Sequence, residues 1–424
     1  MSGIRPLRAL AEVALGRQRS PQYESGPHMR PYLRAANVKD GALDLDDVKE
    51  MNFSAREQQV FGLRTGDVLV SEGSGSLASV GASAVWNDEV PGACFQNTLI
   101  RLRPRSGVDP RFLAWWSRHA FADGLFASIA SGANIFHLSA ERVRRLPIRV
   151  GDMGEQRAIA DFLDAETARI DALITKKQEL ASISVRRWSA ELLKRLALST
   201  TEDGAGPAWI PNDLPDGWTV LPLKRLISQS WSGDWGAEPG VLGNDMPCVR
   251  AADFEFSQLA ARTGVVRSFD EAVRRTKALR PRDLVIEKSG GGENVSVGRV
   301  VAWHGETEAI TTNFAAAMRP DPSHDPDFVL LAFRAAYEIG LPWRAIKQTT
   351  GLQNLDMSSY LASPWPVPPR REQERIASDM MDLLDATLGL EGASKRQIAL
   401  LRERRQALIT AAVTGEITVP GIAA

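Results

Sequence analysis

Two stretches of the chain carry apolar residues at helical spacing over most of their length. In the first, which begins at Glu155, these residues recur at gaps of three, four or seven, the period of one helical face. The apolar positions are Ile159, Leu163, Ile170, Leu173, Leu180 and Ile183. Neither proline nor glycine occurs between Glu155 and Ser199. The pattern therefore predicts one continuous helix of roughly 65 Å.

The second stretch runs from about Arg371 to Thr414 and predicts a similar helix. Its apolar positions are Ile376, Met380, Leu383, Ile398, Leu401 and Leu408. Gly389 and Gly392 lie in the middle, and because glycine destabilises a helix interior we expect a kink or a break there. Gly415 is a suitable residue to end the helix.

Long helices with one apolar stripe are not stable alone in water, so the simplest prediction is that these two pack against each other. Glu166 and Lys177 interrupt the stripe, which leaves room for a further helix from a partner protein. The alternative is that each helix covers its own domain independently.

The sequence before each helix predicts short strands, tight turns and a few short helices, as in "DVLV", "NTLIRL", "DLVIE" and "GRVVAW". This is the pattern of an α/β or α+β domain. The chain matches itself in order at a shift of 216 or 217 residues, so the whole unit is an internal repeat. Matching segments begin at Arg5 and Leu221, Met29 and Met246, Gly66 and Arg282, Gln96 and Thr312, Arg103 and Arg319, Asp109 and Asp325, and Glu155 and Glu372.

A polar, Gly- and Pro-rich linker begins at Ser199 and separates the two copies. "SPWPVPPRREQE", from Ser363, is the entry to the second helix. We therefore expect four segments: a domain over residues 1–150, a long helix and linker over 151–206, a second domain over 207–369 and a second long helix over 370–424.

Composition adds little that is specific. The net charge of the 424 residues is −1, and basic clusters near Arg101, Arg142 and Val273 are equally well explained as solvated faces. No apolar run is long enough for a membrane span and no signal-peptide pattern is present. Cys94 and Cys248 lie in different copies without metal-ligand spacing, which indicates buried thiols in a reducing cytoplasm.

Catalytic motifs are scarce: the sequence contains no phosphate-binding loop, no H-E-x-x-H, no G-x-S-x-G and no C-x-x-C. We expect no catalytic residue and no metal ligand. Gly-rich segments at Gly73 and Ser289 occupy the same place in both copies, either as strand-connecting turns or as loops that approach a ligand closely. Two related domains on helical spacers suit a partner that is a regular rod, such as duplex DNA.

The chain resembles the specificity subunit of type I restriction-modification systems. The resemblance covers nearly the whole chain. It is carried by the EQ-x-x-IA openings at Glu155 and Glu372, the segments "LDAETARIDALITKKQEL" and "LRERRQALITAAVTGEI", and looser "GD-x-L-V" and "S-G-G-G…V-G-R" elements.

The resemblance implies two α/β (α+β) target-recognition domains that each read half of a split DNA site, related by a pseudo-two-fold repeat. Two long antiparallel coiled-coil helices would separate the domains and set the gap between half-sites. It implies two methyltransferase subunits and an optional endonuclease subunit as partners in phage defence. S-adenosylmethionine, ATP and Mg would bind those partners, and this chain would bind no cofactor and perform no catalysis. The rival interpretations are a coiled-coil scaffold that binds proteins and an enzyme with hidden nuclease chemistry.

Candidate DNA-contacting residues are loop positions with amide, hydroxyl, imidazole or lysine groups, or glycines that permit close approach. They are Ser74, Gly75, Asn134, His137, Lys288, Ser289, Gly290, Gly291, Lys347, Gln348, Gln353 and Asn354. Candidate contacts to the partner subunits lie along the helices. They are Arg186, Arg187, Arg404, Arg405 and Gln406.

Overall fold

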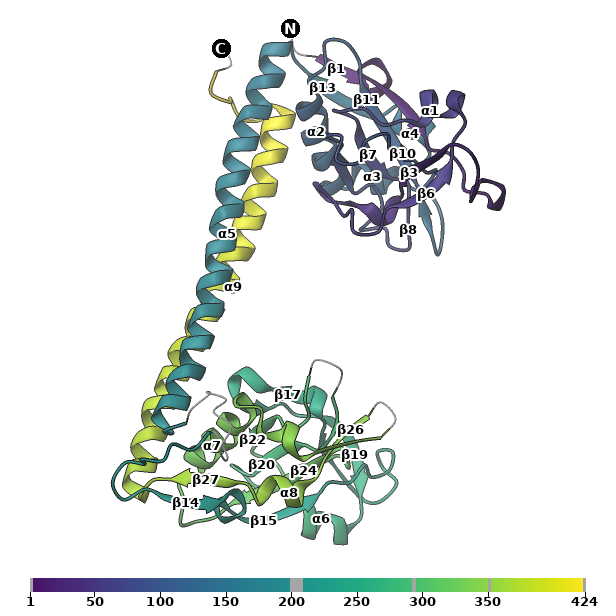
Figure 1. Cartoon of the computed structure of the whole chain (residues 1–424). Helices are drawn as coiled ribbons and strands as arrows, with labels where there is room; N and C mark the ends of the chain where they lie inside the picture. Colours follow the sequence, from purple (N-terminus) through teal and green to yellow (C-terminus); the bar gives the residue numbers. More distant parts are fainter. Residues whose placement is uncertain (1–2, 199–208, 292–294, 350–351, 422–424) are drawn as a thin grey trace. The chain divides into compact units, whose positions relative to one another are not determined.

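The computed structural model describes residues 3–198, 209–291, 295–349 and 352–421 (Figure 1). The chain forms two compact units. Unit 1 comprises Met1–Lys177 together with Arg396–Ala424, and unit 2 comprises Gln178–Lys395. The division falls within helices α5 (Met153–Arg195) and α9 (Arg370–Thr414), so each unit contains a segment of both long helices.

Unit 1 is built on a four-stranded antiparallel sheet of order β2-β11-β7-β9. Its strands are β2 (Ala11–Leu15), β11 (Leu99–Pro104), β7 (Val68–Ser71) and β9 (Ser83–Val85). Both faces are covered, as β7 shows: Val68 and Val70 pack in the core beneath helix α2 (Pro110–Ala122), and Leu69 packs in a separate core on the opposite face. This explains the uninterrupted apolar run, because a strand buried on both faces does not alternate.

The rest of unit 1 consists of small sheets and short helices. A three-stranded sheet has the order β10 (Cys94–Phe95), β3 (Met29–Leu33) and β6 (Lys49–Asn52). Strand β1 (Gly3–Pro6) pairs with β13 (Pro147–Val150), and β4 (Val38–Lys39) with β5 (Ala42–Leu43). The short helices are α1 (Ala55–Phe61), α3 (Leu125–Ile129) and α4 (Ala140–Val143).

Unit 2 repeats this plan. Its main sheet has the order β15 (Ile227–Ser232), β24 (Ala315–Pro320), β20 (Leu284–Glu287), β22 (Val300–Trp303), β18 (Ala260–Ala261) and β17 (Phe254–Glu255). The smaller sheet is β19 (Val265–Phe269), β16 (Asn244–Val249) and β23 (Ile310–Thr311), and β14 (Thr219–Pro222) pairs with β27 (Pro364–Val367). The helices are α6 (Glu271–Lys277), α7 (Pro326–Glu338) and α8 (Met357–Leu361).

The repeat extends to the capping of the main helices. Helices α2 and α7 each have 13 residues and begin with proline after an aspartate, Asp109 or Asp325. In both, the aspartate side chain accepts hydrogen bonds from the first free backbone N–H groups, which stabilises the helix start. The predicted internal repeat is therefore confirmed at the level of the fold.

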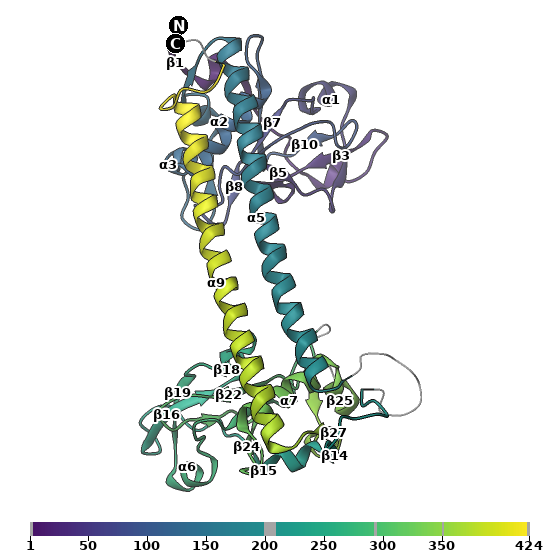
Figure 2. The same ribbon diagram turned by 90° about the vertical axis from the view of Figure 1, so that its left-hand side faces the viewer.

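Within unit 1 the segments of α5 and α9 run antiparallel, since Asp171 contacts Arg405 and Lys177 contacts Gln397. Figure 2 shows α5 in teal beside α9 in yellow to green. Helix α9 passes through Gly389 and Gly392 without interruption, so an expected break is wrong, whereas a kink stays a prediction. A glycine costs a helix interior only about 1 kcal/mol, which its long helical flanks outweigh. Gly415 has a φ of 79° and follows the last helical residue, as predicted.

The predicted apolar stripe is buried only in part. In unit 1, Ile159, Leu163 and Ile170 are buried, whereas Leu173 is exposed. In unit 2, Trp188 donates its indole N–H to the Met380 carbonyl at 3.1 Å, but Leu180 is half exposed. Other exposed apolar residues on the two helices are Ile183, Leu383, Leu390 and Leu400. Throughout the described ranges, every helix is too short or too polar to cross a membrane.

Candidate nucleic-acid interface

The Gly-rich segment of unit 1 is a short strand. Strand β8 (Gly73–Ser74) pairs with β12 (Phe136–His137), so that Ser74 lies opposite Phe136 and Gly73 opposite His137. His137 is exposed, and its Nδ1 lies 3.2 Å from a Glu72 carboxylate oxygen. Asn134 is exposed in the bend that the Ser131–His137 bridge closes. The fold thus joins the two predicted loops of this domain.

Unit 2 brings six predicted residues onto one small sheet. Strand β21 (Ser289–Gly290) pairs with β26 (Leu352–Leu355), which pairs with β25 (Ile346–Thr349). Ser289 lies opposite Asn354, and its hydroxyl donates to the Asn354 side-chain oxygen at 2.6 Å. The registers also place Gly290 and Gln348 opposite Gln353, and Lys347 opposite Asn354.

The candidate side chains on and beside this sheet differ in their exposure and in their hydrogen bonds. Lys347 is 76% exposed, and its Nζ lies 2.7 Å from Asp356. The hydrogen bond from Lys347, with those from Ser359, lowers the pKa of Asp356 to about 2, so the carboxylate stays charged near neutral pH. Lys288 donates to the Ser232 hydroxyl at 3.0 Å.

Gln353 differs from its neighbours because only 3% of it is exposed. Its side-chain oxygen accepts a hydrogen bond from the Val297 N–H at 3.2 Å. A Cβ added to Gly291, whose φ is 70°, would lie 2.7 Å from the same oxygen. In this conformation the Gln353 side chain is buried and bonded to the Val297 backbone. Its contact with a base edge stays a prediction. The side chain of Gln348 lies outside the described residues.

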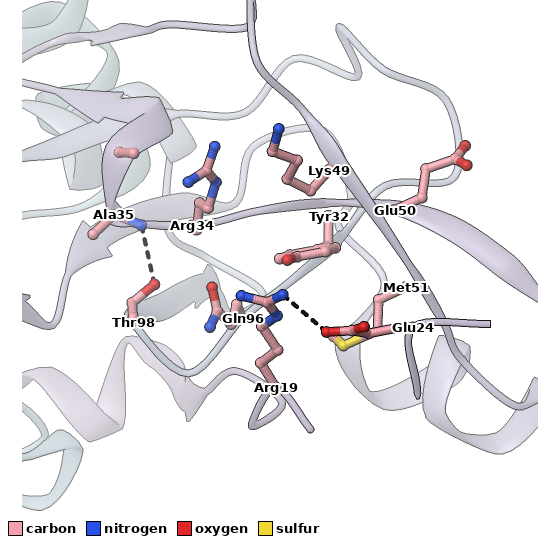
Figure 3. Close-up of a pocket in the computed structure, with 11 residues that line it drawn as sticks. Arg19, Glu24, Tyr32, Arg34, Ala35, Lys49, Glu50, Met51, Gln96 and Thr98 are labelled. Carbon is pink, nitrogen blue, oxygen red and sulfur yellow. Dashed lines mark hydrogen bonds and ion pairs between the residues drawn. The ribbon is translucent and has the colours of Figure 1, made fainter. Parts of the chain in front are cut away.

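Beside these strands each unit has a hollow that the sequence-based prediction missed. In unit 1 it has a volume of 540 Å³ (Figure 3). Its lining combines three cations and two carboxylates with uncharged polar groups: Arg19, Arg34, Lys49, Glu24, Glu50, Tyr32, Gln96 and Thr98. Arg19 pairs with Glu24 at 2.9 Å and Arg34 pairs with Asp47, yet all three cations retain solvent exposure.

The hollow of unit 2 has a volume of 490 Å³ and lies at the equivalent place. Its lining includes Trp235, Arg250, Ser289, Thr312, Asn313 and Phe314. The equivalence follows from strand pairing: β3 aligns Leu33 with Phe95, and β16 aligns Val249 with Thr311. Arg34 and Arg250 come directly after these strands. The sequence signal for this pair of hollows is the repeated "RAA", which begins at Arg34 and Arg250.

Exposed guanidinium and amide groups in a hollow suit phosphates and the edges of base pairs. The two linings differ, with more cations in unit 1 and more aromatic surface in unit 2. Within the described part of the chain, no group of three or more His, Cys, Asp or Glu side chains is arranged to hold a metal ion. Burial raises the pKa of Cys94 to about 11 and of Cys248 to about 12, and both thiols are buried as predicted.

The five predicted partner-contacting residues divide between the two units. In unit 2, Arg186 and Arg187 are exposed on α5. In unit 1, Arg404 is exposed, whereas Arg405 lies 3.1 Å from Asp171. Gln406 donates to Thr410 at 3.3 Å. Arg187 borders an 810 Å³ hollow between the α5 and α9 segments of unit 2, together with Glu191, Lys194, Arg195, Asp379 and Leu383.

Comparison with known proteins agrees with this geometry. A sequence profile of the type I restriction modification DNA specificity domain matches residues 16–182. The specificity subunit of the type I restriction enzyme StySPI from Salmonella potsdam is 23% identical over 395 residues, covering 92% of this chain and 82% of that protein. The subunit of EcoKI from Escherichia coli (strain K12) is 20% identical over 394 residues with the same coverage.

Solved structures share the fold. One chain, from work on the assembly and conformational transition of a type I restriction-modification system, has a TM-score of 0.73 at 18% identity and covers 98% of both chains. The specificity subunit of Thermoanaerobacter tengcongensis has a TM-score of 0.53 at 18% identity, covering 98% of this chain and 97% of that chain. With its duplicated fold and its long helices, the chain is similar over nearly its whole length to the specificity subunits of type I restriction-modification systems.

Proposed function

We propose that this chain selects the DNA sequence on which a type I restriction-modification complex acts. One observation carries the proposal: the two units repeat the same arrangement of a main sheet, a smaller sheet and a capped helix, but line equivalent hollows with different side chains. A duplicated reader with unlike contact residues recognises two unlike half-sites. The DNA site is therefore bipartite and asymmetric, and base contacts come from the hollows and the strands beside them.

The chain acts as a non-catalytic subunit, and its partners supply the chemistry. Two methyltransferase subunits dock on the helical part, with an endonuclease subunit as a further component. The exposed apolar residues of α5 and α9, such as Leu180 and Leu400, support this assignment because partner helices would bury them. S-adenosylmethionine, ATP and Mg belong to those partners, and the complex works in the cytoplasm.

Sequencing of methylated sites tests the proposal directly. The chain is co-expressed with its methyltransferase subunit in a host without other adenine methylation, and methylated positions are mapped across the genome. The expected result is one motif with two unlike half-sites and an unspecified gap of fixed length. The control is the methyltransferase subunit alone, which should give no motif. Methylation of the same motif without this chain would contradict the proposal and favour a scaffolding role.

A further inference from the structure

Thr98 and Phe314 occupy the same backbone position in the two units. Each follows an asparagine, Asn97 or Asn313, after the short parallel strand. Their carbonyl groups accept equivalent hydrogen bonds: from the Glu72 N–H to Thr98 at 2.8 Å and from the Lys288 N–H to Phe314 at 2.9 Å. Phe314 accepts a second, from the Ser289 N–H, at 2.9 Å. The backbone is thus fixed alike in both units, and the side chains can be compared directly.

The two side chains are used differently. The Thr98 hydroxyl accepts a hydrogen bond from the Ala35 N–H at 3.0 Å, so it is satisfied within its own domain. The Phe314 ring is 51% exposed. Burying a phenylalanine side chain is favourable, and the fold leaves half of this one in solvent on a rigid backbone. A single exposed ring is ordinary on a protein surface, but Phe314 shares its hollow with a second exposed ring, Trp235, and together they form an apolar surface that another molecule can cover.

The surroundings of the ring indicate what that molecule presents. Trp235, on the same hollow, is 41% exposed, with the Arg267 guanidinium 4.7 Å from its ring. The polar groups that share the hollow include Ser289, the carboxylate of Glu287, and Arg250, which pairs with Asp253 at 3.0 Å. Unit 1 instead places Arg19, Lys49 and Gln96 on its hollow. The hollow of unit 2 therefore combines an apolar contact surface with hydrogen-bonding groups beside it.

Given the proposed function, on which this inference rests, we propose that the Phe314 ring contacts the 5-methyl group of a thymine in the half-site read by unit 2. Thymine is the one base that presents an apolar group in the major groove, and aromatic side chains are suitable partners for it. Unit 1 has Thr98 at the matched position, which offers no aromatic ring, and reads its half-site mainly through hydrogen bonds. Phe314 is then a specificity-determining residue.

The test uses the complete complex of this chain with its methyltransferase subunits and duplexes that carry the mapped motif. Each thymine is replaced in turn by uracil, which removes only the methyl group. One replacement in the half-site of unit 2 should weaken binding about fourfold, the value of one buried methyl-sized group. Phe314→Ser, which leaves no methyl group on the side chain, should weaken binding to the unmodified duplex by a similar factor and abolish the response to uracil. Phe314→Leu, which keeps an apolar side chain, should retain part of it.

Thr98→Val in unit 1 is the matched control and should leave the uracil response in the half-site of unit 2 unchanged. The proposal is overturned if that half-site has no thymine, if no uracil there weakens binding, or if the losses from uracil and Phe314→Ser simply add. A complex that bound no specific duplex at all would instead overturn the proposed function, and this inference with it.

Discussion

Gln156 links the start of α5 to the start of α2 through Asp109. Its side-chain oxygen accepts a hydrogen bond from the Asp109 N–H at 2.9 Å, and its amide nitrogen donates to the Gly151 carbonyl at 3.0 Å. Gln373 makes the same link in unit 2, with the Asp325 N–H at 3.0 Å and the Pro368 carbonyl at 2.9 Å. The repeated Glu-Gln pair therefore persists in both copies because its glutamine attaches a recognition domain to its long helix.

Gln156→Ala should destabilise unit 1 and Gln373→Ala should destabilise unit 2, each by about 1–3 kcal/mol, because a buried N–H and a carbonyl lose their partner. Gln156 is 1% exposed and Gln373 is 2% exposed, so water does not replace the lost bonds. Denaturant unfolding of the purified chain is the measurement. Gln178→Ala, at an exposed position on the same helix, is the control and should change stability by less than about 0.5 kcal/mol. Equal stability of all three variants would show that the link is dispensable.

A second matched pair joins an arginine on β11 or β24 to the aspartate that precedes the neighbouring strand, β7 or β20. Arg103 contacts both carboxylate oxygens of Asp67 at 2.7 Å, and Arg319 contacts those of Asp283 at 2.9 and 2.7 Å. Asp67→Ala leaves the arginine without its partner and should cost about 3–5 kcal/mol of stability. The double variant Asp67→Ala with Arg103→Met should recover much of that loss, since no unpaired charge remains. Unfolding curves of the two variants decide, and a double variant no better than the single one would contradict the explanation.

His119 makes the stability of unit 1 depend on pH. Burial lowers the pKa of His119 below its ordinary value, and the ring lies 3.2 Å from both Thr410 and Asp123. The native state thus holds the neutral ring, while the unfolded chain binds the proton more readily. Above the ordinary histidine pKa of about 6.5, the folded state has the full stability that the neutral ring allows. As the pH drops through this value, the free energy of unfolding falls, by about 1.4 kcal/mol in total for each unit by which folding lowers the pKa of His119. The loss levels off below the lowered pKa of the folded state.

Thermal unfolding between pH 8 and pH 5 measures this effect. His119→Gln should remove the corresponding part of the pH dependence, although it costs some stability at pH 8. A variant at the exposed His137 is the comparison and should leave the curve of the original chain nearly unchanged. If the His119 variant kept the full pH dependence, other groups would be responsible.

Arg404 and Arg405 should respond differently to charge reversal although they are neighbours. Arg404→Glu changes an exposed side chain, so it should leave stability within about 0.5 kcal/mol but reduce co-purification with the methyltransferase subunit. Arg405→Glu breaks the contact with Asp171 and should destabilise the helix pair, with recovery in the double variant with Asp171→Arg. Unchanged co-purification of the Arg404 variant would mean that this arginine is not needed for docking.

The long helices and the internal repeat were predicted best, because their patterns can be read along the chain without knowledge of the folded contacts. Helical period and the absence of proline located both long helices to within a few residues, and the shift between copies predicted the duplicated fold. The burial of Gln353 could not be predicted, because its partner Val297 and its close neighbour Gly291 lie about sixty positions away in the sequence. The hollows were missed for the same reason, since separate segments around Arg34 and Gln96 meet only in the folded domain. The expected break at Gly389 overestimated a small helix penalty.

Unit 1 is built from two separate segments of the chain, and this affects the order in which the protein folds during its synthesis. Its core contains Leu7 and Ile100 together with Ile409, Val413 and Val419 from the other end of the chain. Unit 2, by contrast, is one uninterrupted block, Gln178–Lys395. Domains usually fold in the order in which the ribosome makes them. Here the unit that is begun first is completed last, since its core closes only after the final helix has been translated.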